Sequence, residues 1–84
     1  MQTLAKWNYE KHEYDEYEVP KEWNVKLYSE DMKEIINCPH CGETLEYGNS
    51  YTSLEIHNYL GFGFAVCSKC YDEEWGRKRN ASEN

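Results

Sequence analysis

The feature that most constrains this chain is a pair of Cys-X-X-Cys motifs separated by 25 residues. Cys38 and Cys41 form the first motif, Cys67 and Cys70 form the second, and the sequence has no other cysteine. In such a motif the two sulfur atoms converge, so two motifs brought together supply the four thiolates of a tetrahedral metal site. The pattern therefore predicts one ion bound by all four cysteines, and zinc is the metal that prefers this ligand set.

The rest of the composition explains why the fold would need such a site. Leu, Ile, Val and Phe together account for only 13 of the 84 residues, although 13 aromatic residues, mostly Tyr and Trp, add apolar surface. A domain this small seldom buries enough apolar surface to fold without disulfide bonds, a metal ion or a partner. One structural zinc ion is therefore expected to act as the cross-link.

The redox state of the cysteines depends on the compartment. No apolar stretch is long enough to span a bilayer, and the N-terminal residues lack the apolar segment of a signal peptide. The protein is therefore expected in the cytoplasm, where thiols stay reduced and paired motifs hold metal. Disulfide bonds are the alternative for an exported protein. His40 and His57 are alternative ligands, but they are expected to be exposed knuckle or strand residues.

Residues 35–75 resemble a zinc ribbon, in which two cysteine knuckles cap β-hairpins. The first knuckle, CPHCG at residues 38–42, matches the family pattern, whereas Tyr71 follows Cys70 where the family usually has glycine. The resemblance implies a small β-rich α+β domain of antiparallel hairpins with a short C-terminal helix. The missing second glycine and the polar surroundings argue against the alternative, an iron site like that of rubredoxin.

Apolar alternation predicts the remaining elements. Residues 17–28 alternate around Pro20 as an edge strand or two short strands, and further strands are expected over 44–47, 51–58 and 62–66. A short helix is expected from Tyr71, with acidic residues 72–74 near its start and basic residues 77–79 near its end, as the helix dipole favours.

The domain organisation follows from these elements. The aromatic residues within residues 1–18 have a spacing that fits neither a helix nor a strand, so this segment is expected to be an acidic, aromatic N-terminal arm. Residues 19–79 are expected to form a single zinc-ribbon-like domain, and residues 80–84 a flexible tail.

The formal net charge of −7 is unevenly distributed. Residues 10–22 contain six acidic residues, and no Lys or Arg lies between Lys33 and Lys69. An acidic surface disfavours direct contact with nucleic-acid phosphates and favours a basic protein surface as the partner. The residues expected to bind that partner combine carboxylates with aromatic anchors: Tyr9, Glu10, Glu13, Tyr14, Asp15, Glu16, Tyr17, Glu18, Glu22 and Trp23. The alternative is that they only keep the protein soluble.

Catalysis is not expected. A zinc ion with four cysteine ligands has no open position for water. The segment Leu54-Glu55-Ile56-His57-Asn58 resembles part of a His-Asn-His nuclease motif. However, only nine residues separate His57 from Cys67, too few for that family's metal-binding loop and helix, and the segment lacks a basic groove.

In size, charge and predicted metal use, the chain resembles small phage and prophage proteins that block host nucleic-acid enzymes. Among these are anti-CRISPR inhibitors of RNA-guided nucleases, which occupy basic DNA-handling surfaces. The resemblance implies an acidic zinc-binding inhibitor of a basic host protein that contacts neither nucleic acid nor membrane directly. The second hypothesis is a zinc-ribbon accessory protein of the transcription machinery, and the third is a degenerate nuclease.

Overall fold

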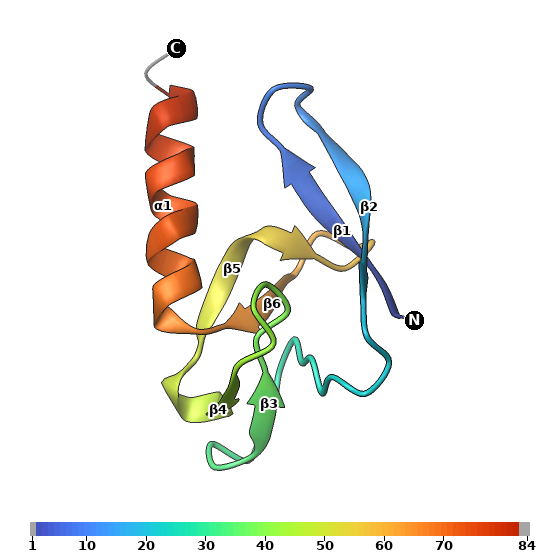
Figure 1. Cartoon of the computed structure of the whole chain (residues 1–84), viewed down its shortest axis with the longest axis vertical. Helices are drawn as coiled ribbons and strands as arrows, with labels where there is room; N and C mark the ends of the chain where they lie inside the picture. The colour runs from blue at the N-terminus through green and yellow to red at the C-terminus, as the bar shows by residue number, and fades with distance from the viewer. Residues whose placement is uncertain (1, 83–84) are drawn as a thin grey trace.

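Two antiparallel sheets and one helix make up residues 2–82, the part of the chain that the computed structural model describes (Figure 1). The elements are β1 (Gln2–Asn8), β2 (Glu13–Val19), β3 (Ile35–Asn37), β4 (Thr44–Glu46), a 3₁₀ turn η1 (Tyr47–Asn49), β5 (Tyr51–His57), β6 (Gly63–Val66) and α1 (Ser68–Ser82). This arrangement confirms the predicted fold class, a small β-rich α+β domain of antiparallel hairpins with a C-terminal helix.

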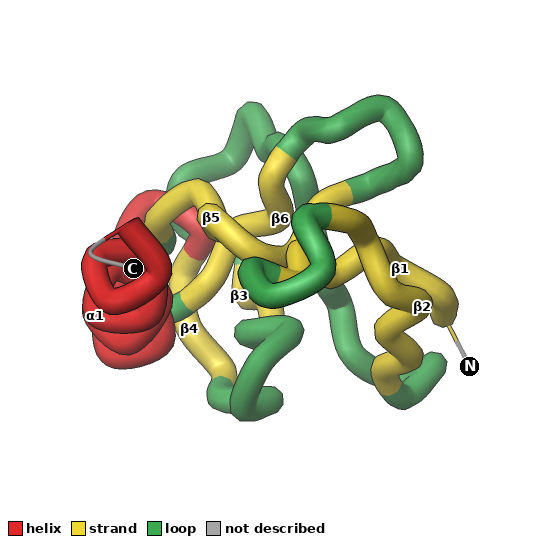
Figure 2. Tube along the Cα trace, turned by 90° about the horizontal axis from the view of Figure 1, so that it is seen from above, coloured by secondary structure: helices red, strands yellow, loops and turns green. Residues whose placement is uncertain are grey.

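The larger sheet joins the two ends of the chain. Its strand order is β2-β1-β5-β6, so the N-terminal hairpin pairs with a strand from the second half of the sequence. The pairing of β1 with β5 places Ala5 opposite His57 and Lys6 opposite Ile56. Strands β3 and β4 form a separate two-stranded sheet. Figures 1 and 2 show α1 alongside β5 at one side of the molecule and hairpin β1–β2 at the other.

Two apolar clusters form the core, and β6 contributes to both. The first cluster contains Leu4, Val19, Ile56 and Phe64, against which Tyr17, Trp23 and Val25 pack. The second contains Val66 and three of the cysteines, Cys38, Cys67 and Cys70, with Leu45 and Tyr71 packed around it. Three of the cysteines are therefore core residues, and the stability of the second cluster depends on whether their thiols bind a metal ion.

Hairpin β1–β2 forms over residues 2–19, and for residues 2–16 the sequence predicted no strand. The side chains of β2 that turn toward the protein are those of Asp15, Tyr17 and Val19, so a polar residue interrupts the apolar alternation. The Asp15 carboxylate accepts a hydrogen bond from the Asn8 side chain at 2.9 Å. This hydrogen bond allows a charged side chain to occupy a partly buried position in the strand. The boundary expected between residues 18 and 19 lies inside β2, and residues 2–19 belong to the larger sheet.

The strand expected over residues 17–28 stops at Val19, because Pro20 follows and cannot donate a ladder hydrogen bond. Residues 20–28 contain no strand, but their backbone still joins the two sheets. The carbonyl of Asn24 accepts a hydrogen bond from the Asn37 N–H at 3.0 Å, and that of Lys26 accepts one from the Ala65 N–H at 2.8 Å. Residues 20–28 are therefore hydrogen-bonded to β3 of the smaller sheet and to β6 of the larger sheet.

The later elements follow the prediction closely. Strands β4, β5 and β6 lie within the ranges expected from the apolar alternation. Helix α1 begins at Ser68, three residues before the expected start, because the second cysteine motif forms its first turn. It continues to Ser82 through the first part of the expected tail, whereas residues 83 and 84 lie outside the described residues. Within residues 2–82, no helix has the length and apolar character needed to cross a membrane.

Candidate metal centre

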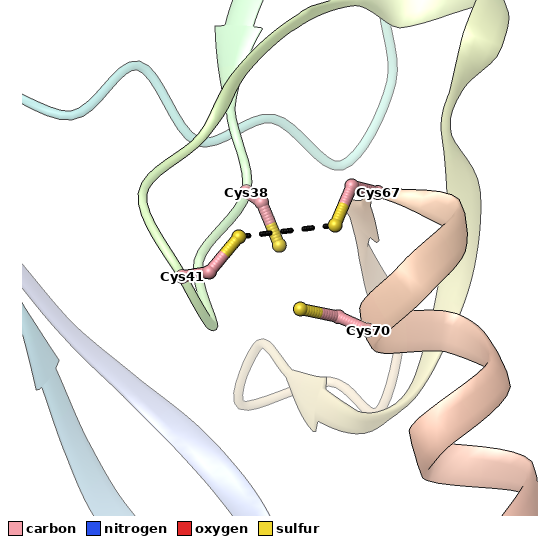
Figure 3. Close-up of side chains that lie close together, drawn as sticks. All are labelled: Cys38, Cys41, Cys67 and Cys70. Carbon is pink, nitrogen blue, oxygen red and sulfur yellow. Dashed lines mark hydrogen bonds between the residues drawn. The ribbon is translucent and has the colours of Figure 1, made fainter.

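The four cysteine sulfur atoms converge on one point (Figure 3). All of them lie within 4.8 Å of one another, and the Sγ atoms of Cys41 and Cys67 are 3.8 Å apart. A tetrahedral zinc site with Zn–S bonds of about 2.3 Å has sulfur–sulfur distances of roughly 3.8 Å. The cluster can therefore hold one metal ion with all four thiolates as ligands, as the spacing of the motifs predicts.

The turn between β3 and β4 carries the first two cysteines. Cys38 donates its N–H to the Glu43 carbonyl at 2.9 Å, and Gly42 donates its N–H to the Cys38 carbonyl at 2.7 Å. Gly42 has a φ of +79°, a conformation that residues with a side chain rarely adopt. A Cβ atom at this position would also lie 2.5 Å from Cζ2 of Trp23. Glycine is therefore required here by both conformation and packing.

The second pair of cysteines lies at the junction of β6 and α1. Cys67 follows the strand and Cys70 lies in the first turn of the helix, where the Tyr71 N–H donates to the Cys67 carbonyl at 3.0 Å. This hydrogen bond is equivalent to the one from Gly42 to Cys38. Because the chain continues as a helix, no left-handed residue is needed after Cys70. Tyr71 can therefore stand where a zinc ribbon usually has glycine, and its ring stacks on Tyr51 with centroids 5.0 Å apart.

Burial sets the acidity of the free thiols. Cys38, Cys67 and Cys70 are buried, whereas Cys41 is exposed. Burial raises the pKa of the Cys38 and Cys70 thiols. Burial also acts to raise the pKa of Cys67, but hydrogen bonds from the Cys70 backbone and the neighbouring thiols outweigh it and lower that pKa. A metal ion binds thiolates, so its binding must displace the protons that burial holds on Cys38 and Cys70.

His40, between the first two cysteines, belongs to a second polar cluster. Its Nε2 atom lies 2.6 Å from Oε2 of Glu74, a fully buried residue of α1. Glu74 also accepts hydrogen bonds from the Ser53 hydroxyl and the Leu54 N–H. Burial alone would raise the pKa of Glu74, but the hydrogen bonds from His40, Ser53 and Leu54 lower it. An ionised carboxylate therefore links the first knuckle, β5 and α1.

Glu55 forms the other half of this cluster. Its carboxylate accepts two hydrogen bonds from the Arg77 guanidinium, at 2.6 Å from Nε and 2.9 Å from Nη2. One ligand atom each from His40, Glu55 and Glu74 would lie close enough together to bind an ion. However, every one of the four carboxylate oxygens already accepts a hydrogen bond. The arrangement supports a hydrogen-bonded network that includes the Glu55–Arg77 salt bridge, rather than a second metal site.

The sequence analysis missed this network. His40 was expected to be exposed, but its side chain is only 12% exposed, and Glu74 is a buried partner rather than a surface charge at the helix N-terminus. Arg77 binds Glu55 and does not serve only as a basic residue near the helix end. The signal in the sequence was the spacing of Cys70, Glu74 and Arg77, which places them on one face of a helix at i, i+4 and i+7.

The ten residues predicted to bind a partner divide into three groups by exposure and packing. Six carry exposed side chains on hairpin β1–β2 or just after it: Glu10, Glu13, Tyr14, Glu16, Glu18 and Glu22. Tyr9 and Asp15 are half-buried. Tyr17 and Trp23 pack against the first core cluster, and the Tyr17 hydroxyl donates to the Pro39 carbonyl at 2.7 Å. The hairpin thus brings the acidic residues together and turns two of the aromatic residues inward.

The histidine of the nuclease-like segment lies at the end of β5. Nδ1 of His57 is 3.1 Å from the Glu55 carbonyl oxygen, and its ring packs edge-on against Tyr14 with centroids 5.4 Å apart. The neighbouring Glu55 carboxylate is bound to Arg77 and so does not pair with His57.

Comparisons of the chain with protein-family models, curated proteins and solved structures give no match. What the protein does must therefore be inferred from its own geometry and charge.

Proposed function

We propose that this protein is a non-catalytic, zinc-binding module that binds and inhibits a basic protein through the carboxylates of hairpin β1–β2. The observation that carries the proposal is the position of β2, which is an edge strand of the larger sheet. Glu13, Glu16 and Glu18 are exposed along this strand. Glu16 and Glu18 share one face of the strand, and Glu13 lies at its start. Exposed like charges on a sheet edge discourage pairing with other acidic strands and suit a partner of opposite charge.

Zinc is the metal that the donor set favours. Four thiolates at tetrahedral distances are the ligands of a structural zinc site, which leaves no position for water or substrate. The ion would thus supply stability, with no role in a reaction. Four thiolates and one divalent ion also add about two negative charges to the chain, by simple valence counting. The zinc-loaded protein is therefore a stronger electrostatic match for a basic surface than the free chain is.

The partner that this charge suits is a host protein that handles nucleic acid, because such proteins carry Lys and Arg where they contact phosphates. An RNA-guided nuclease is the specific candidate, in keeping with the resemblance to anti-CRISPR inhibitors. A component of the transcription machinery is the alternative, and it would suit the same acidic hairpin. The two are distinguished by which protein is retained and inhibited.

Affinity capture tests the proposal. Zinc-loaded protein is immobilised, exposed to bacterial lysate and washed at increasing salt, and retained proteins are identified by mass spectrometry. The substitutions Glu13→Gln, Glu16→Gln and Glu18→Gln are combined in one variant. The matched control combines Glu30→Gln, Glu43→Gln and Glu73→Gln, which are exposed elsewhere.

We expect the basic partner to elute as salt screens the charges, and to be lost from the β2 variant and not from the control. Metal analysis of the purified protein is expected to give one zinc per chain. Salt-independent capture, or equal capture by both variants, would argue against the electrostatic interaction. A zinc-free folded protein would argue against the metal.

A further inference from the structure

The turn between β5 and β6 leaves three large apolar side chains in solvent. Tyr59, Leu60 and Phe62 are 73%, 80% and 63% exposed. The chain has few aliphatic and Phe residues, so their concentration in one exposed turn is not explained by the stability of the fold. Apolar residues that gather on an exposed surface mark sites of interaction.

The conformation of this turn, residues 58–62, is held by its own hydrogen bonds. The Asn58 side-chain oxygen accepts hydrogen bonds from the N–H groups of Leu60 and Phe62, at 3.0 and 2.9 Å. The Asn58 backbone N–H donates to the Phe62 carbonyl at 2.9 Å, and Gly61 has a φ of +90° that suits glycine. The apolar side chains are therefore presented by an ordered turn, which lowers the entropy cost of binding.

A cleft of about 240 Å³ lies between this turn and hairpin β1–β2, which run close to each other in Figures 1 and 2. Leu4 and Ala5 are buried residues that line it, and Tyr14 and Tyr59 add aromatic surface. The remaining lining residues include two carboxylates and no Lys or Arg: Asp15, Glu16, Asn58 and Gly61. The cleft is smaller than the roughly 300–1,000 Å³ of small-molecule sites, so it suits a single large side chain.

We infer that the 58–62 turn and this cleft form a docking site for a basic protein segment with one large apolar side chain flanked by Lys or Arg. The apolar side chain occupies the cleft, while the flanking cations face Asp15 and Glu16. Leu60 and Phe62, exposed on the same turn as Tyr59, supply further apolar contact surface beside the cleft lining. The inference rests on the proposed function, since it specifies which part of a basic partner the acidic hairpin contacts.

Charge complementarity is what selects this occupant. The protein carries a net charge of −7, and the cleft lining contains Asp15 and Glu16 but no Lys or Arg. Lys11, which pairs with Asp15 at 3.8 Å, is an exposed residue that does not line the cleft. An anionic membrane surface and a second copy of the chain are both negatively charged, so both are repelled where the basic segment is attracted. An apolar anchor with a complementary charged rim is the usual composition of a protein-binding hot spot.

Peptide titration followed by NMR tests the inference. Isotope-labelled, zinc-loaded protein is titrated with a synthetic peptide that has one Phe in the middle of a run of Lys and Arg. One control peptide has Ala in place of Phe, and another has the Phe within a run of Glu. We expect the amide signals of Ala5, Glu16 and residues 59–62 to shift with the first peptide. Its affinity should exceed that of the Ala peptide by about tenfold, from burial of the ring.

A pair of variants locates the site. Tyr59→Ser combined with Phe62→Ser should remove the preference for the Phe peptide. Tyr28→Ser combined with Met32→Ser, which alters side chains that are 69% and 57% exposed elsewhere, should keep it. Both pairs change exposed residues, so neither is expected to disturb the fold.

The outcomes separate this inference from the proposed function. Equal, salt-dependent binding of the Phe and Ala basic peptides, without shifts in residues 59–62, would overturn the docking site and leave the acidic hairpin as the binding surface. Failure of every basic peptide to bind, or equal binding of the Glu peptide, would overturn both. Binding to anionic phospholipid vesicles, or dimerisation that the Tyr59 and Phe62 substitutions abolish, would replace the basic segment with another occupant.

Discussion

Glu74 is a carboxylate without exposed surface in an acidic protein. It accepts hydrogen bonds from His40, Ser53 and Leu54, which belong to the first knuckle and to β5. A buried charge is costly unless it is paired, and removing one partner leaves the others unsatisfied. Glu74 is therefore expected to contribute strongly to the packing of α1 against the first knuckle and β5.

Glu74→Ala is expected to lower the free energy of unfolding by about 3 kcal/mol, because it leaves buried donors without an acceptor. Glu73→Ala is the matched control, since Glu73 is exposed on the same turn of α1. The control should change stability by about 0.5 kcal/mol or less. Urea unfolding of the two metal-loaded variants measures the difference, and equal losses would refute the assigned role.

The ionisation of the Tyr9 hydroxyl determines part of the pH dependence of stability under alkaline conditions. Its hydroxyl oxygen is buried and, among residues 2–82, has no partner in hydrogen-bonding geometry. Burial, followed by the nearby carboxylates of Glu55 and Glu74, raises the pKa of Tyr9 from 10.0 to about 12. Because the folded-state pKa is the higher one, the contribution of Tyr9 is fully present below pH 10 and is lost as the pH rises toward 12.

We therefore expect Tyr9→Phe to remove the tyrosinate absorbance change near pH 12 and to flatten the loss of stability between pH 10 and 12. An absorbance titration, with circular dichroism recorded in parallel, checks both effects. If the variant titrates like the wild type at high pH, Tyr9 is not the residue concerned.

At the scale of elements, two glycines with positive φ allow the cost of backbone strain to be compared with the cost of a steric clash. Gly42, in the first knuckle, has a φ of +79° and lies against Trp23. Gly61, in the β5–β6 turn, has a φ of +90°, and a Cβ atom there would have nothing within 4 Å. An alanine would be strained in both places but would clash only in the knuckle.

Gly61→Ala is expected to lower stability by about 1 kcal/mol, the cost of the left-handed conformation. Gly42→Ala should lower it by an additional 1–3 kcal/mol or so, because the Trp23 ring must move. It should also weaken zinc binding, since the knuckle moves with it. Denaturation curves and zinc competition with a chromogenic chelator provide the measurements. Equal effects of the two substitutions would show that the Trp23 contact is unimportant.

The elements that could be predicted from sequence are those whose pattern is local. Strands β5 and β6 show apolar alternation next to a glycine-containing turn, and the prediction there was correct. Hairpin β1–β2 was missed because the inward position of Asp15 is satisfied by Asn8, seven residues away along the chain. The start of α1 was placed too late because Cys70 was assigned to a ribbon knuckle, whereas it belongs to the helix.

At the scale of the whole molecule, the cysteine cluster is also one of the two core clusters. Three of the four cysteines belong to the second core cluster, and the first cluster has only four buried members, Leu4, Val19, Ile56 and Phe64. Structural zinc contributes an apparent 10–16 kcal/mol or so in small zinc domains at neutral pH. That exceeds the typical stability of a domain of this size, about 5 kcal/mol.

Removal of zinc by a strong chelator is therefore expected to unfold the whole protein rather than only the knuckles. Circular dichroism and Trp fluorescence should show one cooperative loss of structure, reversed by stoichiometric zinc and not by magnesium. A zinc-free protein that keeps its dispersed NMR spectrum would show that the two core clusters suffice without the ion.

The convergence of the four cysteines could be predicted because the motif spacing and the ligand preference of zinc leave few alternatives. The network of His40, Glu55, Glu74 and Arg77 could not be predicted as a whole. It requires three elements, distant in sequence, to meet in space, and each residue alone has an ordinary surface explanation. The sequence shows only that Glu74 and Arg77 share one face of α1 with Cys70, and not that His40 and Glu55 meet them there.

The connection between the two ends of the chain has a consequence for protein synthesis. Strand β1 leaves the ribosome early but pairs with β5, and Cys38 and Cys41 must wait for Cys67 and Cys70. A nascent chain that stops before α1 lacks Cys70, so it cannot complete the four-sulfur cluster. It also lacks the helix that packs against β5 of the larger sheet. Assembly of the four-sulfur cluster therefore has to follow synthesis of α1, and the first two cysteines are without their partner thiols until then.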